Sequence, residues 1–560
     1  MVHMIGMDLL LWKRVYMGNN ILEIKQLCVD FLTEDKSTNA VIDFSLSIKN
    51  DEILGLVGES GSGKSTVIKS ILRILPAPGV ITNGEIIFQN KNLLDYNESD
   101  LSSIRWSKIS LVKQKALNSL NPLLTIQDQI IDTIKAHETI SHKDAINRCQ
   151  YLMDLVEIDK FHLKSYPHEL SGGMRQRVVI AIALALKPKL IIMDEPTTAL
   201  DVVIEKEIIL KVLELKAKLK FSLLFITHDL NLILSFADRI GVMQSGKLID
   251  LETATKIKSG GTNSYTKKLI DSIPNLKKIK TNPIISKHSN LIIIKNLLKT
   301  FEQNSLLLKS DKIIAVNNVS FNINKNEIVG LVGESGSGKS TISKILTKLI
   351  DYDKGEIIFN DKLISDIRSK DDLLSFRKNI QMIFQDPFAS LNSIHTVFHH
   401  LSRPILIHNS FKNMSNDEIK ASVKEKILKI LSEVGLNPPK DFLYRFPHEM
   451  SGGERQRISL ARALLVEPKV IIADEPTSML DMSIRMEILD LFKELQIKKG
   501  ISILFITHDI ASACYISDRL IVLKNGEIVD SGNLEDIINN PKHNYSKLLI
   551  KSSQPNWFRK

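Results

Sequence analysis

The sequence lacks the features that metal modules, disulfide frameworks and membrane-spanning domains require. Its 560 residues include only three cysteines, Cys28, Cys149 and Cys514, and none of them are spaced as paired metal ligands. This excludes a zinc module, an iron–sulfur cluster and a disulfide framework, and it fits a reducing compartment. The longest apolar stretch runs only from Val178 to Leu186. Because a membrane helix needs about 18 consecutive apolar residues, we expect no membrane span.

Neither the composition nor the charge of the chain selects a function. Hydrophobic residues make up 43% and charged residues 25%, as in ordinary globular proteins. The net charge of +10 has two explanations, an anionic neighbour such as a membrane surface or RNA, or a lysine-rich surface throughout, and we favour the second. The N-terminal stretch has no secretory cleavage pattern, and Met17 is a second candidate for the start besides Met1.

Four motifs occur twice in the same order, which predicts a duplicated architecture. The ten residues Val57–Thr66 are identical to Val332–Thr341. The other three motifs are Ser-Gly-Gly, Asp-Glu-Pro-Thr and Thr-His-Asp, and the two copies of each lie 280 positions apart. These copies occupy residues 171–173 and 451–453, 194–197 and 474–477, and 227–229 and 507–509.

The repeat predicts a first domain at residues 20–278, a short linker at 279–290 and a second domain at 291–555. The linker is rich in Lys, Asn, Ser and Pro and shows no apolar periodicity. In the first half, Ile53–Val57, Leu190–Met193 and Ser222–Ile226 have the composition of buried strands, and each is followed by candidate functional residues. Strands that end in chemistry at their C-terminal ends are typical of a parallel α/β sheet.

Two glycine loops match the pattern G-x-x-x-x-G-K-[ST] between a strand and a helix. Their glycines let backbone N–H groups surround phosphates, and the following helix N-terminus adds partial positive charge. Lys64 and Lys339 are placed to reach the β- and γ-phosphates, and Ser65 and Ser340 to hold Mg²⁺. The predicted phosphate-binding residues are Gly58, Glu59, Ser60, Gly61, Ser62, Gly63, Lys64, Ser65 and Thr66, and Gly333, Glu334, Ser335, Gly336, Ser337, Gly338, Lys339, Ser340 and Thr341.

Paired carboxylates follow a buried strand in each half. Asp194 and Asp474 suit a second contact to Mg²⁺, usually through water. Glu195 and Glu475, one residue later, are placed to accept a proton from an attacking water, a role that contributes about 10²–10⁴-fold to a rate. The sequence therefore predicts hydrolysis of MgATP.

The residues from Leu170 to Arg177 resemble the signature of the ATP-binding cassette (ABC) family, and Met450 to Arg457 resemble it with Met for the leading Leu. The resemblance implies two tandem P-loop NTPase ABC-type nucleotide-binding domains in the α/β class. Each would have a mostly parallel sheet core, an antiparallel β part and a helical subdomain. The signature residues of each half would contact the ATP held by the other half; they are Ser171, Gly172, Gly173, Ser451, Gly452 and Gly453.

Further residues match elements of that family one by one. Gln114 and Gln385 resemble the glutamine that senses Mg²⁺ and the attacking water, and so count as catalytic and metal candidates. His228 and His508 resemble the histidine that contacts the γ-phosphate. The loop that crosses between halves would contain Asp201 and Asp481. Two interpretations stay open for Phe31 and Phe301, which either stack on adenine or belong to the core.

One loop departs from the family pattern. The second half has Phe384-Gln385-Asp386-Pro387, as family members do, whereas the first has Lys113-Gln114-Lys115-Ala116. In the family this loop lies where a membrane partner docks. The departure therefore puts coupling through the first half in question more than hydrolysis there.

Three functions compete, and the sequence favours a membrane importer. A DNA-repair cassette ATPase would carry zinc-binding cysteines and large insertions, and a ribosome-associated protein would carry a long charged arm between its cassettes. Ser-Leu-Asn after each glutamine loop, Pro-His-Glu before each signature and a Tyr-Thr/Ser tail in each half are similar to the peptide/nickel import subfamily in its fused form. Its members include microcin C, oligopeptide, dipeptide and glutathione transporters.

That resemblance implies specific partners and a location. The protein would bind two transmembrane permease subunits, receive substrate indirectly from an extracytoplasmic binding protein, and sit peripherally on the cytoplasmic face of the inner membrane. Its cofactors would be ATP and Mg²⁺, with no nucleic acid and no iron–sulfur site. The transported substrate, and whether both ATP sites turn over equally, stay open.

Overall fold

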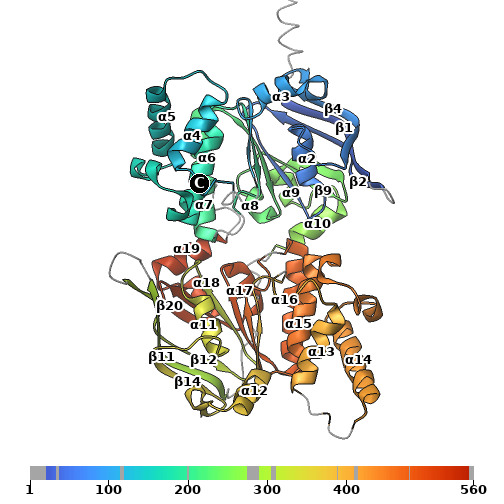
Figure 1. Ribbon diagram of the computed structural model, residues 1–560, viewed down its shortest axis with the longest axis vertical. Helices are drawn as coiled ribbons and strands as arrows, with labels where there is room; N and C mark the ends of the chain where they lie inside the picture. Colours follow the sequence, from blue (N-terminus) through green and yellow to red (C-terminus); the bar gives the residue numbers. More distant parts are fainter. Residues whose placement is uncertain are drawn as a thin grey trace, which may run out of the picture. The chain divides into compact units, whose positions relative to one another are not determined.

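The computed structural model describes residues 20–32, 37–113, 119–197, 201–273, 289–303, 311–387, 389–408, 411, 414–478 and 480–553. Within this part of the chain the fold divides into two compact units, drawn from blue to green and from yellow-green to red in Figure 1. Most described residues up to Ile273 belong to the first unit, and those from 289 onward to the second. None of the described helices combines the length and apolar character needed to cross a bilayer.

The first unit contains two sheets. One has four antiparallel strands in the order β2-β1-β4-β5, and the other has six strands in the order β10-β9-β3-β8-β7-β6. In the six-stranded sheet only the pairing of β9 with β10 is antiparallel. The strands are β1 (Asn20–Leu32), β2 (Ser37–Lys49), β3 (Ile53–Gly58), β4 (Gly79–Phe88), β5 (Lys91–Asn92), β6 (Ile109–Val112), β7 (Leu190–Asp194), β8 (Ser222–Thr227), β9 (Arg239–Gln244) and β10 (Lys247–Thr253).

Some helices of the first unit form a separate group. In Figure 1, α4, α5 and α6 lie together and apart from the antiparallel sheet. The helices are α2 (Lys64–Ile71), α3 (Glu98–Ile104), α4 (Ile126–Lys135), α5 (His142–Leu155), α6 (Gly172–Leu184), α7 (Val202–Leu219), α8 (Leu230–Leu234), α9 (Ala254–Lys258) and α10 (Ser264–Asp271), with 3₁₀ turns at Leu93–Asp95, Lys160–Lys164 and Pro167–Glu169.

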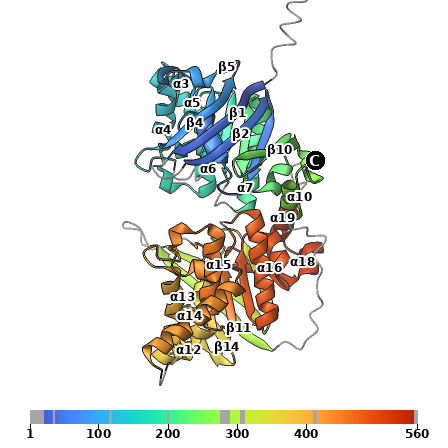
Figure 2. The same cartoon turned by 90° about the vertical axis from the view of Figure 1, so that its right-hand side faces the viewer.

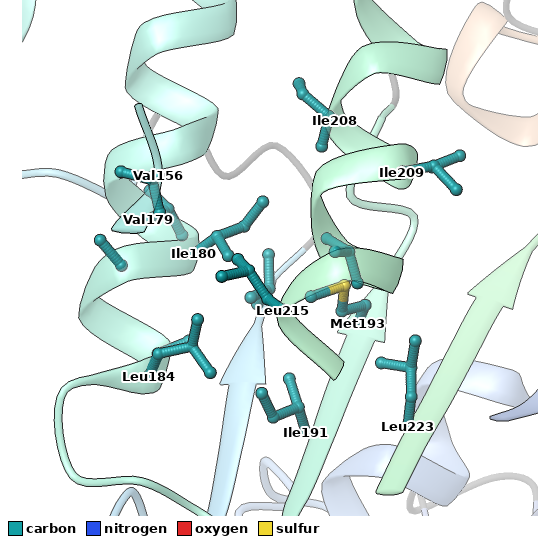
Figure 3. Packing of buried hydrophobic residues seen from close by; sticks show 14 of the residues in the cluster. Val156, Val179, Ile180, Leu184, Ile191, Met193, Ile208, Ile209, Leu215 and Leu223 are labelled. Carbon is teal, nitrogen blue, oxygen red and sulfur yellow. The ribbon is translucent and has the colours of Figure 1, made fainter. Parts of the chain in front are cut away.

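The parallel sheet is buried on both faces, because successive residues of each strand point to opposite sides. In β8, Leu223 and Phe225 belong to the cluster shared with α6 and α7, whereas Leu224 and Ile226 pack toward the antiparallel sheet and α2. Figure 3 shows the first of these faces, where Ile191 and Met193 of β7 meet side chains of both helices. This packing explains why the strands are continuous apolar runs.

Helix starts are set by capping residues in the sequence. Ser141 precedes α5, and its hydroxyl oxygen accepts a hydrogen bond from the N–H of Asp144. This bond satisfies one of the N–H donors that a helix N-terminus leaves unpaired. In the second unit, Ser415 and Glu418 form a reciprocal capping box before α14. Local chemistry therefore defines where the outer helices of each unit begin.

The second unit repeats the architecture. Its sheets have the orders β12-β11-β14-β15 and β16-β17-β18-β13-β19-β20. Helices α13, α14 and α15 lie together in both Figure 1 and Figure 2. The elements are β11 (Asn290–Gln303), β12 (Asp311–Asn324), β13 (Ile328–Gly333), β14 (Lys354–Phe359), β15 (Lys362–Leu363), β16 (Ile380–Ile383), β17 (Val470–Asp474), β18 (Ser502–Thr507), β19 (Arg519–Lys524), β20 (Glu527–Asn533), α11 (Lys339–Leu346), α12 (Lys370–Asn379), α13 (Val397–His408), α14 (Asn416–Glu433), α15 (Gly452–Leu464), α16 (Met482–Lys499), α17 (Ile510–Ile516), α18 (Leu534–Asn539) and α19 (Asn544–Ser552), with 3₁₀ turns at Ile364–Asp366, Pro439–Phe442 and Pro447–Glu449.

The predicted fold class is confirmed. Both units have a mostly parallel sheet, an antiparallel sheet and a group of helices, and the three strands predicted in the first half are β3, β7 and β8. The domain limits at 20–278 and 291–555 stay predictions, and most of the linker lies outside the described residues.

Replacing Phe225 by Ala should destabilise the protein by about 3–5 kcal/mol, because it opens a cavity beneath α6 and α7. Phe225 is 1% exposed and its ring meets Phe236 edge to face at 5.1 Å. Urea denaturation followed by circular dichroism measures the change. Phe161→Ala is the matched control, since this ring is 78% exposed, and an equal loss in both variants would contradict the packing argument.

Candidate active sites

The C-terminal ends of three parallel strands gather the candidate residues of the first half at one edge of its sheet. The glycine loop follows β3, Asp194 ends β7, and His228 follows β8. Strand β8 lies between β3 and β7 in the sheet, so the three ends are neighbours. The second half places its glycine loop, Asp474 and His508 in the same way on β13, β17 and β18.

Glycine is required at the last position of each glycine loop. Gly63 and Gly338 precede α2 and α11 and both have φ of 101°, in the left-handed region. A Cβ on Gly63 would lie 2.6 Å from the carbonyl oxygen of Ala40 in β2, and one on Gly338 would collide with that of Ala315. A residue with a side chain would therefore be strained and would push the loop away from the antiparallel sheet.

The loop lysines are turned inward by backbone oxygens. The Lys64 ammonium donates to the carbonyls of Gly58 at 2.7 Å and Glu59 at 2.8 Å and to the Ser62 hydroxyl at 3.2 Å. Lys339 donates to Gly333 and Glu334 at 2.8 and 2.7 Å. Both lysines are nearly buried, and burial lowers the pKa of Lys339. The ammonium groups thus close the loops at the points where phosphate charge is expected.

The loop serines meet the strand-end aspartates. The Ser65 hydroxyl donates to Asp194 at 3.4 Å, and the Ser340 hydroxyl donates to Asp474 at 3.2 Å. Burial raises the pKa of Asp194 to about 6, and it also raises the pKa of Asp474. Asp474 is buried and Asp194 is partly buried, and the ionised form of each is disfavoured. Both are therefore suited to a cation, which would offset that cost.

Sequence reasoning missed one residue of this group. The Ser343 hydroxyl donates to the second oxygen of Asp474 at 3.0 Å. The signal is its place one helical turn after Ser340, which puts both hydroxyls on one side of α11. The corresponding residue of the first half is Ile68, so Asp194 has no such hydroxyl from that position.

Glutamate and histidine are paired in both halves. His228 Nδ1 lies 3.3 Å from Glu195 Oε1, and His508 Nδ1 lies 3.2 Å from Glu475 Oε1. Both glutamates have left-handed φ, 45° and 47°, a conformation that costs energy in residues other than glycine. The N–H of each donates to the carbonyl at the end of the neighbouring strand, Ile226 or Ile506, which holds the strained turn.

The contacts of the Glu475–His508 pair favour the ionised form of the Glu475 carboxylate. Burial opposes ionisation of Glu475, but the hydrogen bond and charge of His508 hold its pKa below the usual range. Burial likewise opposes protonation of His508, and Glu475 raises its pKa above the usual value. Gln385 Nε2 donates to the other oxygen of Glu475 at 2.8 Å. Glu475 is therefore ready to accept a proton. Gln114, the corresponding glutamine, lies outside the described residues.

Each signature serine begins a helix. Ser171 caps α6 by accepting from the Met174 N–H at 3.3 Å, and Ser451 caps α15 in a capping box with Glu454. Both serines are exposed, while Gly173 and Gly453 are buried against Ile204 and Ile484. Within each unit the signature is thus an exposed helix start. Its predicted contact with ATP of the other half stays a prediction.

The remaining candidates are placed less decisively. Phe31 is partly buried, with its ring against Gly79, and Phe301 is 43% exposed. Neither ring belongs to a buried core cluster, which argues against the interpretation that they are core residues. Stacking on adenine stays a prediction. Asp201 accepts a hydrogen bond from the Val203 N–H, and Asp481 precedes α16.

Comparison with known families explains this double arrangement. A family model described as ABC transporter matches residues 41–198 and 316–478, which is more than half of the chain. The protein belongs to the ABC transporter family. Its two cassettes bind ATP, and it is an ATPase.

Relatives match nearly the whole chain. The glutathione import ATP-binding protein GsiA of Salmonella choleraesuis is 36% identical over 95% of this chain and 89% of its own length. An uncharacterized ABC transporter ATP-binding protein, YejF of Escherichia coli, is 38% identical over 96% of this chain and 100% of its own. The peptidoglycan transport ATP-binding protein YejF of Agrobacterium fabrum is 37% identical over 95% and 96%, respectively.

Replacing Asp194 by Asn should raise stability at pH 7.5 in EDTA without nucleotide. A carboxyl with its pKa raised from 3.8 to about 6 costs stability once ionised, so stability is gained as pH falls through 6 toward 4. We expect a gain of about 1–2 kcal/mol at pH 7.5 that shrinks as pH falls through 6 and vanishes near pH 4, measured by thermal unfolding. Asp474→Asn should gain less, because the amide keeps only one of the two oxygens that accept from Ser340 and Ser343. A lower melting temperature for Asp194→Asn at pH 7.5 would contradict this account.

Proposed function

We propose that this ABC ATPase energises import of a peptide or peptide-like substrate through two partner permease subunits. The observation that carries the proposal is similarity over 95% or more of the chain to ATP-binding proteins named for glutathione import and peptidoglycan transport. An extracytoplasmic binding protein would deliver the substrate to the permeases. The ATPase would lie on the cytoplasmic face of the membrane.

In this proposal each ATP is held by residues of both halves. Lys64 and the first glycine loop bind one triphosphate, and Ser451 with its glycines closes over the γ-phosphate. Lys339 and Ser171 do the same for the second ATP. The inward-turned lysines and the exposed helix starts within each unit support these roles. A positively polarised helix N-terminus stabilises phosphate charge, which favours closure only with ATP bound.

Magnesium fits the chemistry of these sites. Among the described residues, no three His, Cys, Asp or Glu side chains gather as a complete metal-binding group. Mg²⁺ usually takes one or two protein groups and fills its other positions with phosphate oxygens and water. Ser65 and Asp194, and Ser340 and Asp474, offer such incomplete sets, to which Gln114 and Gln385 would add. Bound there, the metal would neutralise charge on the phosphates.

We assign water activation to Glu195 and Glu475. An ionised Glu475 accepts the proton of the attacking water, while His508 holds the carboxylate and meets the γ-phosphate. The 3.2 Å contact of His508 with Glu475 and the 2.8 Å hydrogen bond from Gln385 support this assignment. Release of phosphate then removes the charge that held the halves closed. The reopening would move the permeases.

Glu475→Gln should lower the ATPase rate of the second site by about 10²-fold or more, because the amide cannot accept the proton of the attacking water. Steady-state phosphate release by the purified full-length protein measures the effect, and a nucleotide-binding assay should show ATP retained. Glu195→Gln tests the first site in the same way. Glu487→Gln is the matched control, since that carboxylate is exposed and pairs with Arg457 at 2.8 Å. A protein with both Glu195→Gln and Glu475→Gln that keeps most of its activity would remove the assigned role.

Affinity purification from native membranes in mild detergent should recover two multi-helix permease proteins with the tagged chain. The docking loop differs between halves, with exposed Lys113 in the first and a 42% exposed Phe384 in the second, so we expect two different permeases. Recovery with ribosomes and without permeases would leave the ATPase intact and overturn import.

A further inference from the structure

One partly buried position carries opposite charges in the two halves. Glu205 is the fourth residue of α7 and Arg485 is the fourth residue of α16. They lie 280 positions apart, the same separation as the signature serines, the strand-end aspartates and the histidines. Each follows the predicted crossing loop. Arg485 pairs with Asp509, the residue after His508, and the charge of Asp229, the residue after His228, acts on Glu205. The exchange therefore concerns the surroundings of His228 and His508.

In the second half the position is a cation that holds an anion. Arg485 Nη1 lies 3.4 Å from Asp509 Oδ2. Asp509 immediately follows His508, and its other oxygen accepts from the Ala511 N–H at 3.0 Å, which begins α17. The Asp509 N–H donates to Thr507 Oγ1 at 3.0 Å. Arg485 therefore fixes the residue next to His508 on a turn that is already hydrogen-bonded on both sides.

In the first half the position is a carboxyl beside another carboxyl. Glu205 Oε1 accepts a hydrogen bond from Thr197 Oγ1 at 2.5 Å. Asp229, which corresponds to Asp509, caps α8 by accepting from the Leu232 N–H at 3.0 Å. Burial, and then the negative charge of Asp229, raise the pKa of Glu205 to about 7. The Thr197 hydrogen bond and the positive charges of Lys206 and His228 act in the opposite direction.

We propose that Glu205 and Arg485 are positioning residues for His228 and His508, and that their exchange makes hydrolysis at the first half fall with rising pH while the second half is insensitive at this position. When Glu205 is neutral it accepts the Thr197 hydrogen bond without repelling Asp229. When it ionises, like charges repel beside His228, whose Nδ1 lies 3.3 Å from Glu195. This inference rests on the roles proposed above for the two histidines.

The test compares pH profiles of the ATPase rate for full-length variants between pH 6.5 and 8. Over this range the neutral fraction of a group with pKa about 7 falls about eightfold. The rate of Glu205→Gln relative to the unaltered chain should therefore rise about twofold if both sites contribute equally, and up to about eightfold if the first dominates. Arg485→Glu should make the ATPase rate of the second half fall with rising pH in the same way. Arg485→Gln should instead lower the rate by the same factor at every pH.

Glu207→Gln is the matched control, because Glu207 is an exposed carboxylate of the same helix and should leave the profile unchanged. Identical profiles for Glu205→Gln and the unaltered chain would overturn the inference, as would an unchanged profile for Arg485→Glu. Thermal unfolding checks that each variant is folded, and if Glu205→Gln is not, Arg485→Glu decides alone. An unaltered chain that hydrolyses no ATP at any pH would instead contradict the function itself.

Discussion

The parallel pairing of β3, β8 and β7 is the constraint on which the first site depends, and β13, β18 and β17 play the same part in the second. Parallel strands need helical crossovers, so each strand is followed by a loop and a helix at the same edge of the sheet. The glycine loop, the Asp-Glu pair and the histidine each occupy one of these loops. If the two faces of the sheet were not buried, the strand ends would not be held together and the side chains would lose their common site.

The burial that stabilises the sheet also disfavours the ionised groups of the site. Asp474 is 3% exposed and Lys339 is 4% exposed, so neither ion keeps its full hydration. The protein offsets this locally, with backbone carbonyls around Lys339, hydroxyls on Asp474 and the Glu475–His508 pair. None of these contacts neutralises the aspartate itself. In the function proposed above, magnesium and phosphate charge would complete the arrangement, so nucleotide binding would drive a change in the protein.

The sequence predicted the fold class and the three strands of the first half because these depend on continuous apolar runs and on motifs with one local geometry. It also named the partners that the structure brings together, such as Ser65 with Asp194 and Glu475 with His508 and Gln385. Ser343 escaped, because a serine inside a helix has no pattern of its own and gains its meaning only from Asp474 on another strand. The predicted contact of each signature with the ATP of the other half comes from family resemblance alone, because no local pattern links residues of two units.

Duplication within one chain accounts for the differences between the halves. Two cassettes that always occur together can each lose or change a contact, provided that the pair still works as one machine. Ile68 against Ser343 and Glu205 against Arg485 are such changes, and both act one step away from the repeated motifs, which are identical or nearly so. The repeated motifs contain the groups that we propose contact phosphate. The side chains that contact these groups determine how firmly they are held, and it is at these side chains that the two halves differ.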